Sequence, residues 1–140
     1  MGTGAPRRTC VTGASGQAGR AVVRELLEHG YQVAATDIAP TREDLEADML
    51  RADLTDYGQA LEALKGSEAV IHLANIPAPG ICTPAATFTA NMTMNFNTRP
   101  RAPAALPRYS DVFHAAATLG LSRVVWASSE TTLGLFFGMS

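Results

Sequence analysis

The chain has 140 residues, of which 46% are hydrophobic and 17% charged, and its formal net charge is −2. This composition is ordinary for a globular domain and excludes disorder along the whole chain, while a charge near zero argues against a nucleic-acid binder. Two cysteines, Cys10 and Cys82, are too few for a disulfide framework. The chain shows neither a signal-peptide pattern nor an apolar run that could span a membrane. We therefore predict one domain, 1–140, in a cytoplasmic protein without a membrane partner.

The first 36 residues predict one βαβ unit. Residues 9–12 form a short apolar run that meets a glycine-rich turn, and apolar residues then recur at helical spacing over 16–29. Gly30 supplies a helix stop, and 31–36 is rich in residues that favour strands. The crossover between the two strands should be right-handed.

The next elements continue the alternation of strands and helices. Residues 49–52 predict a short third strand, and Asp56 with Gln59 resembles a capping box that opens a helix ending before Gly66. Residues 69–73 follow as a nearly unbroken apolar run, which a parallel strand covered on both faces requires.

The last third of the chain is less regular. Prolines and a glycine predict a loop over 75–86, while 111–119 predicts a helix and 123–127 a fifth strand. Between them, three prolines and three arginines make 98–110 an irregular insertion that cannot be helical. The whole pattern predicts an α/β fold with a doubly wound, Rossmann-like parallel sheet of about five strands.

The glycine-rich turn predicts a phosphate site. It lies between an apolar strand and an amphipathic helix, and a helix N-terminus offers N–H donors and a positive dipole end without any side chain. Glycines leave room there for a pyrophosphate. The alternative is a tight strand-to-helix turn with no ligand. The residues that we expect to bind a dinucleotide are Gly13, Ser15, Gly16, Gln17, Ala18 and Gly19.

Asp37 ends the second predicted strand, about 20 residues beyond the turn, where a carboxylate can accept hydrogen bonds from the ribose hydroxyls of NAD. Its charge would repel the additional phosphate of NADP, so we predict NAD as the cofactor. Arg42 is close enough in sequence to serve a 2′-phosphate, which leaves NADP as the alternative. A carboxylate that only caps a neighbouring turn is the other interpretation of Asp37.

Four motifs occur together and in order: the glycine turn over 12–19, Asp53-Leu54, His72-Leu73-Ala74 and Ala127-Ser128-Ser129. In this combination the chain resembles the extended short-chain dehydrogenase/reductases. More narrowly, it resembles the NAD-dependent epimerase/dehydratase family, which acts largely on nucleotide sugars. The resemblance covers nearly the whole chain except 98–110.

The resemblance implies roles for further residues. Asp53 and Leu54 would lie against the adenine, and Leu73 and Ala74 would line the cofactor beside the ribose. Asn95 would contact the ribose of the cofactor or support the active site. Ser129 matches the catalytic serine, whose hydroxyl would hydrogen-bond the substrate oxygen. From the residues alone, Leu73 and Ala74 could equally be core residues, Asp53 a helix-entry carboxylate and the serine pair a turn cap.

The family's chemistry also needs Tyr-x-x-x-Lys, which this sequence lacks. Its tyrosines are Tyr31, Tyr57 and Tyr109, and its sole lysine is Lys65. We therefore expect a partial family member without the C-terminal half of the fold and with little turnover as this chain. The alternatives are a non-catalytic NAD(P)-binding sensor and a product with no folded role. A sheet ending at the fifth strand leaves an unpaired edge, which predicts marginal stability and association, with a homodimer as the simplest form.

Overall fold

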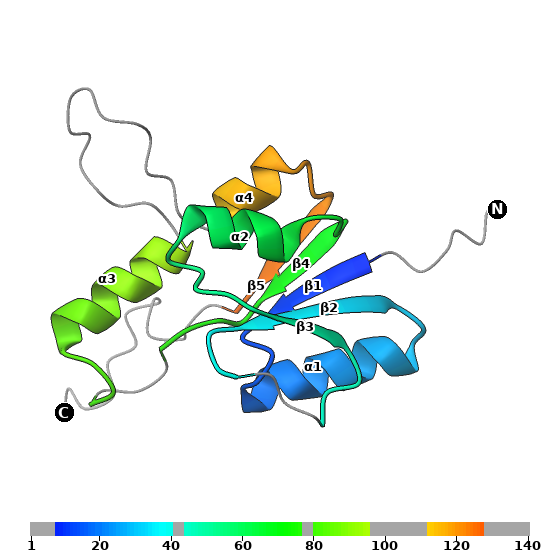
Figure 1. The fold of residues 1–140 in the computed structure, drawn as a ribbon, viewed down its shortest axis with the longest axis horizontal. Coiled ribbons are helices and arrows are strands. Elements are labelled where there is room, and N and C mark those ends of the chain that lie inside the picture. Colours follow the sequence, from blue (N-terminus) through cyan, green and yellow to red (C-terminus); the bar gives the residue numbers. More distant parts are fainter. Residues whose placement is uncertain (1–7, 41–43, 77–79, 96–111, 128–140) are drawn as a thin grey trace, which may run out of the picture.

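A parallel sheet forms the centre of the molecule (Figure 1). The computed structural model describes residues 8–40, 44–76, 80–95 and 112–127, so the predicted insertion at 98–110 lies outside the described residues. The strand order is β3-β2-β1-β4-β5, and every neighbouring pair is parallel. This arrangement confirms the predicted Rossmann-like sheet. The strands are β1 Arg8–Thr12, β2 Gln32–Asp37, β3 Asp48–Arg51, β4 Ala69–His72 and β5 Arg123–Trp126.

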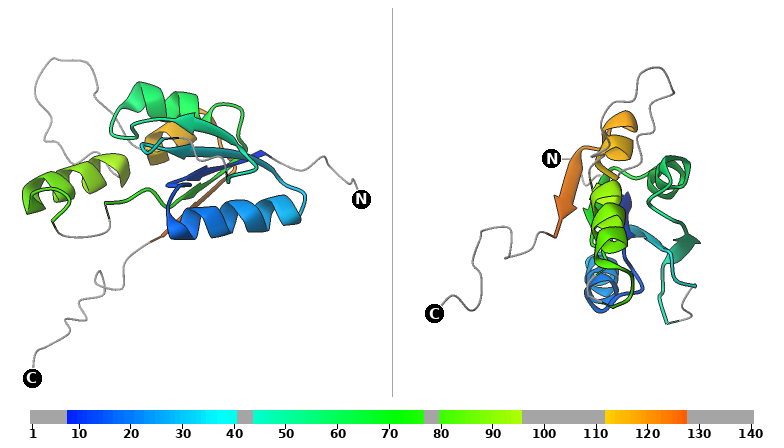
Figure 2. Two further views of the ribbon diagram at one scale, coloured as in Figure 1. Left: turned by 60° about the horizontal axis from the view of Figure 1, so that its bottom comes forward. Right: turned by 90° about the vertical axis from the view of Figure 1, so that its left-hand side faces the viewer.

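Helices cover both faces of the sheet. The chain leaves β1 in one direction to reach β2 and β3, then crosses to β4 and β5 on the other side, so right-handed crossovers place its helices on opposite faces. Figure 1 shows α1 on one face and α2 with α4 on the other. Helix α3 extends beyond the carboxyl ends of the strands (Figure 1 and Figure 2, left). The helices are α1 Gln17–Glu28, α2 Tyr57–Leu64, α3 Pro84–Asn95 and α4 Val112–Thr118.

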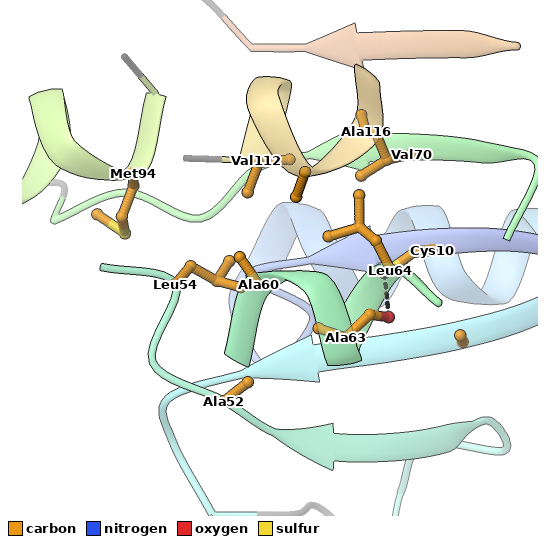
Figure 3. Close-up of a cluster of buried hydrophobic side chains, with 12 residues drawn as sticks. Cys10, Ala52, Leu54, Ala60, Ala63, Leu64, Val70, Met94, Val112 and Ala116 are labelled. Atoms are coloured by element: carbon orange, nitrogen blue, oxygen red, sulfur yellow. Dashed lines mark hydrogen bonds between the residues drawn. The ribbon is translucent and has the colours of Figure 1, made fainter. Parts of the chain in front are cut away.

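Alternation along β1 divides the core in two. Val11 packs on the α1 face, where Val23 is also buried. Cys10 points to the opposite face and packs with residues of α2 and α4 such as Leu64 and Val112 (Figure 3). Burial raises the pKa of the Cys10 thiol to about 12, against a smaller lowering by the charge of Arg8. Cys10 is therefore the buried, free thiol that the apolar strand predicts.

Helix stops lie where glycines predict them. At the end of α1, Gly30 has φ +77° and its N–H donates to Leu27 O over 2.9 Å, while Tyr31 N–H donates to Leu26 O over 3.0 Å. These are the paired hydrogen bonds of a Schellman motif. The left-handed conformation, which residues with a Cβ rarely adopt, explains why glycine stands there.

The predicted capping box forms only in part. Asp56 Oδ1 accepts from Gln59 N–H over 2.9 Å, which caps α2 as expected. The reciprocal bond differs, because Gln59 Oε1 accepts from the N–H of Asp53 over 2.9 Å rather than from that of Asp56. The side chain of Gln59 thus ties the end of β3 to the start of α2.

The predicted loop over 75–86 is wrong at its end. α3 begins at Pro84, because proline at the first helical position sacrifices no intrahelical hydrogen bond. Thr83 precedes it and accepts from Ala86 N–H through Oγ1 over 3.3 Å, as an N-cap does. None of the described helices is long and apolar enough to cross a membrane.

Candidate dinucleotide site

The glycine-rich turn lies at the point where the sheet changes its direction of winding. β1 pairs with β2 on one side and β4 on the other, and the chain's helices leave these strands toward opposite faces. A crevice at the carboxyl ends of such strands is the usual ligand site of open α/β sheets. The turn follows β1 directly, and Gly16 N–H donates to Gly13 O over 3.1 Å to close it.

The three glycines of the turn are required for different reasons. A Cβ on Gly13 would lie 2.7 Å from Ala74 N, and Gly13 also has φ +69°. A Cβ on Gly19 would lie 2.1 Å from Gly13 O. At Gly16 it would meet only that same carbonyl oxygen, at 3.2 Å, and the backbone has an ordinary φ of −70°. The protein's own packing therefore explains Gly13 and Gly19, while at Gly16 a Cβ would make one tight contact that a shift of a few tenths of an ångström would relieve.

The N-terminus of α1 is open to solvent. Gly16 is its N-cap and supplies no side-chain cap, and Gly16, Gln17 and Ala18 are exposed. Helix geometry leaves the amides of a first turn without intrahelical acceptors. In α2, by contrast, the Asp56 carboxylate fills that role. An uncapped first turn that is exposed to solvent can accept an external anion.

Asp37 joins the end of β2 to this turn. Its Oδ2 accepts from Ser15 N–H over 2.9 Å, and its Oδ1 accepts from Ala39 N–H over 3.0 Å. Each carboxylate oxygen can accept more than one hydrogen bond, so both retain capacity for further donors. The carboxylate thus stands beside the glycine turn, oriented by two backbone amides and only partly buried.

The segment after β4 borders the turn from the other side. Leu73 N–H and Ala74 N–H each lie 3.2 Å from Thr12 Oγ1, and His72 Nδ1 lies 2.6 Å from the same oxygen. Leu73 packs against the α1-face core and Ala74 against the α2 and α4 core. Both residues therefore take the core contacts that the sequence allowed, while their backbone lies against Gly13.

Asp53 has a local role in the structure. Its Oδ1 accepts from Thr55 N–H over 2.9 Å and from Thr55 Oγ1 over 2.7 Å, which is the helix-entry arrangement that the sequence left open. Leu54 is buried in the core formed with α2 and α4. Contacts of these two residues with an adenine stay a prediction.

Two predicted site residues cannot be placed. Asn95 is the last residue of α3, but its side chain lies outside the described part, and so does Ser129. Another asparagine of α3, Asn91, contacts the segment after β4. Asn91 Oδ1 accepts from Ile76 N–H over 2.9 Å and its Nδ2 donates to Ile76 O over 3.2 Å, which anchors the segment after β4.

Sequence reasoning assigned no role to Thr12, His72 or Asn91. The signal for the first two was present, since each is a polar residue that ends an otherwise apolar strand. No local pattern could have paired them, because they are 60 residues apart and meet only through the sheet.

The comparison with known families agrees with this geometry. The family model described as "NAD dependent epimerase/dehydratase family" matches residues 9–136. The chain belongs to this family. Cinnamoyl-CoA reductase 1 of Oryza sativa subsp. japonica is 31% identical over 137 residues, which cover 90% of this chain and 35% of that protein.

Solved structures of a dehydrogenase and an epimerase are similar to this chain. A mutant of uronate dehydrogenase from Agrobacterium tumefaciens, complexed with NAD, is 26% identical with a TM-score of 0.65 and covers 89% of this chain and 42% of its own. A UDP-galactose 4-epimerase is 25% identical with a TM-score of 0.70 over 94% of this chain and 41% of its own. The chain spans less than half the length of each of these relatives.

Proposed function

We propose that this chain is the dinucleotide-binding part of an oxidoreductase of the epimerase/dehydratase family and that the turn over 13–19 binds the pyrophosphate of NAD. The observation that carries the proposal is Gly16. It is exposed, has an ordinary φ and leaves the amides of the first turn of α1 without a side-chain cap, and within the described protein a Cβ there would make one tight contact, 3.2 Å from Gly13 O. A ligand that must approach the backbone closely accounts for a glycine at such a position.

The remaining residues would hold the rest of the cofactor. The Asp37 carboxylate, already oriented by Ser15 N–H, would accept the adenosine ribose hydroxyls and disfavour a 2′-phosphate, which makes NAD the preferred cofactor over NADP. In this proposal the residues around the adenine and the second ribose are Asp53, Leu54, Leu73, Ala74 and Asn95.

The bound nicotinamide would supply a hydride donor or acceptor. The chain's contribution to chemistry would be Ser129, whose hydroxyl would donate to the substrate oxygen. A substrate that exchanges a carbonyl for a hydroxyl, such as a nucleotide sugar, fits this chemistry. A relative in the solved structures is a UDP-galactose 4-epimerase, and another is a uronate dehydrogenase.

A second candidate is a dinucleotide sensor that binds without turnover. Residues 1–140 contain no Tyr-x-x-x-Lys, so the enzyme candidate needs this motif from outside them and the sensor does not. Tyr57, for example, directs its hydroxyl to Thr118 Oγ1 over 2.9 Å and so joins α2 to α4. The coding sequence beyond Ser140 separates the candidates, because an in-frame Tyr-x-x-x-Lys supports the enzyme and its absence supports the sensor.

The binding proposal is tested by calorimetric titration of NAD and NADP against the wild-type chain and Gly16→Val. We expect NAD to bind more tightly than NADP, and the substitution to weaken NAD binding at least about tenfold. Gly58→Val is the control on α2, because a Cβ there also meets a single oxygen at 3.2 Å, the side-chain Oδ1 of Asp56 in place of the backbone oxygen of Gly13. Failure of both dinucleotides to bind would refute the site, and tighter NADP binding would refute the role of Asp37.

A further inference from the structure

Thr12 Oγ1 is a junction between β1, β4 and the segment that borders the glycine turn. It lies 3.2 Å from Leu73 N and 3.2 Å from Ala74 N, and 2.6 Å from His72 Nδ1. Leu73 N–H is shared with the carbonyl oxygen of Thr12, also at 3.2 Å. Thr12 is fully buried and His72 is 2% exposed, so water does not compete for these bonds.

The number of bonds determines their direction. A hydroxyl has two acceptor lone pairs and one hydrogen to donate. Because the two amides can only donate, they occupy both lone pairs of Thr12 Oγ1. The third partner must then accept, so the Thr12 hydroxyl donates to His72 Nδ1. This in turn requires the neutral imidazole with its proton on Nε2.

We propose that His72 is a positioning residue for the dinucleotide site and acts through the hydroxyl of Thr12. By accepting the Thr12 hydrogen, Nδ1 keeps both lone pairs of Oγ1 directed at the amides of Leu73 and Ala74. Those bonds hold the segment after β4 against Gly13, where a single Cβ would already collide with Ala74 N at 2.7 Å. The effect on dinucleotide binding rests on the proposed function. The hydrogen-bond geometry around Thr12 does not depend on it.

Loss of the acceptor at Nδ1 of His72 would disturb the hydrogen bonds of Thr12 Oγ1. A hydroxyl hydrogen without its nitrogen acceptor would be left unsatisfied in a buried position or would rotate toward the amides that now donate to the oxygen. The ring of His72 also packs edge-on against Phe113 of α4, with centroids 6.1 Å apart. Any test must therefore separate the acceptor at Nδ1 from the bulk of the ring.

Three variants make that separation. His72→Asn keeps an acceptor near the position of Nδ1, whereas His72→Leu removes it, and Thr12→Val removes the junction itself. Thr36→Val is the matched control, because Thr36 lies opposite Thr12 in the register of β1 and β2, is 1% exposed, and its hydroxyl has no hydrogen-bond partner within the described residues.

The first measurement uses the dinucleotide-free chain. Hydrogen exchange of the Leu73 and Ala74 amides should accelerate about tenfold in His72→Leu and Thr12→Val and stay within about threefold of wild type in His72→Asn and Thr36→Val. The double variant Thr12→Val/His72→Leu should be no faster than Thr12→Val alone. Long-range ¹H–¹⁵N spectra of the wild-type imidazole should show Nε2–H with Nδ1 as an acceptor, and this readout needs no variant to fold.

The second measurement is NAD affinity, which we expect to fall about tenfold in His72→Leu and to be retained in His72→Asn. A protonated Nδ1 in the wild type would overturn the proposal. Equal losses of NAD affinity in the two His72 variants would also overturn it, because the effect would then come from the packing of the ring. If the wild type bound no dinucleotide, the proposed function would fail, while the exchange rates and the tautomer would still decide the hydrogen-bond network.

Discussion

Strand β1, Arg-Thr-Cys-Val-Thr, is less apolar than strand β5, Arg-Val-Val-Trp, yet it is the more deeply buried of the two. β1 pairs on both sides and its last three residues are fully buried, whereas β5 pairs with β4 and all four of its residues are exposed. Val125 is 56% exposed and Trp126 48%. The contrast teaches that an apolar run predicts a strand but not its burial, which depends on what lies on either side.

The α4 helix covers β5 only in part. Phe113 meets the Trp126 ring edge-on with centroids 5.6 Å apart, yet nearly half of the Trp126 surface remains exposed. Leu119 at the end of α4 is also exposed. The proposed dinucleotide site lies at the end of the enclosed strand β1, whereas the β5 edge is the part of the sheet whose apolar surface α4 leaves open.

The largest expected effect on the unfolding free energy is at Gly19, which packs against the turn after the enclosed strand β1, in contrast to Gly30, which has no such neighbour. Gly19→Val should cost more than about 4 kcal/mol of unfolding free energy, because its Cβ would stand 2.1 Å from Gly13 O and only backbone could yield. Gly30→Ala should cost only about 1 kcal/mol, since it has φ +77° but open space. Urea unfolding measures both, and equal losses would contradict the assignment.

A pair of valines compares the two strands directly. Val11→Ala should lower the unfolding free energy by about 2 kcal/mol, because Val11 is fully buried between β2, β4 and α1. Val125→Ala should change it by less than about 0.5 kcal/mol, as expected for an exposed position. If the two substitutions had the same effect on the urea midpoint, β5 would be covered in solution.

Cys10 reports on burial through alkaline pH. With its folded pKa raised to about 12 and an ordinary value of 9.0, the unfolded thiol ionises first, so this contribution to stability is complete below pH 9 and is lost as pH rises toward 12. The slope should approach roughly 1.4 kcal/mol per pH unit. Measuring the unfolding free energy of the wild type and of Cys10→Ala at several pH values isolates the contribution of this thiol. Identical slopes against pH in the two proteins would show that Cys10 is solvated.

The smallest expected effect concerns the start of α2. Asp56→Ala should cost about 1 kcal/mol, because the carboxylate that accepts from Gln59 N–H would be lost. The same change leaves the Gln59 bond to Asp53 N–H in place. A loss of several kcal/mol in thermal unfolding would mean that Asp56 supports more than the cap.

Features that depend on a few neighbouring residues were predictable. The spacing of apolar residues located β1, α1, β2 and β4, and Gly30 marked the end of α1 because a left-handed residue favours glycine wherever it occurs. The loop predicted over 75–86 failed at Pro84, where the same residue that breaks a helix interior can begin one. Proline does disrupt the interior of a helix, but at the first helical position it is tolerated.

By itself the sequence determined that a glycine turn follows an apolar strand and opens a helix, because those signals are local. Only the tertiary structure decided that Gly13 and Gly19 are required by the protein's own backbone while Gly16 is more weakly constrained by it. It also decided that Asp37 holds Ser15 and that Thr12 meets His72 across 60 residues. It also left β5 exposed. Contacts and burial of this kind depend on the order of the strands and on residues far apart in the sequence, so the neighbouring residues of a position do not determine them.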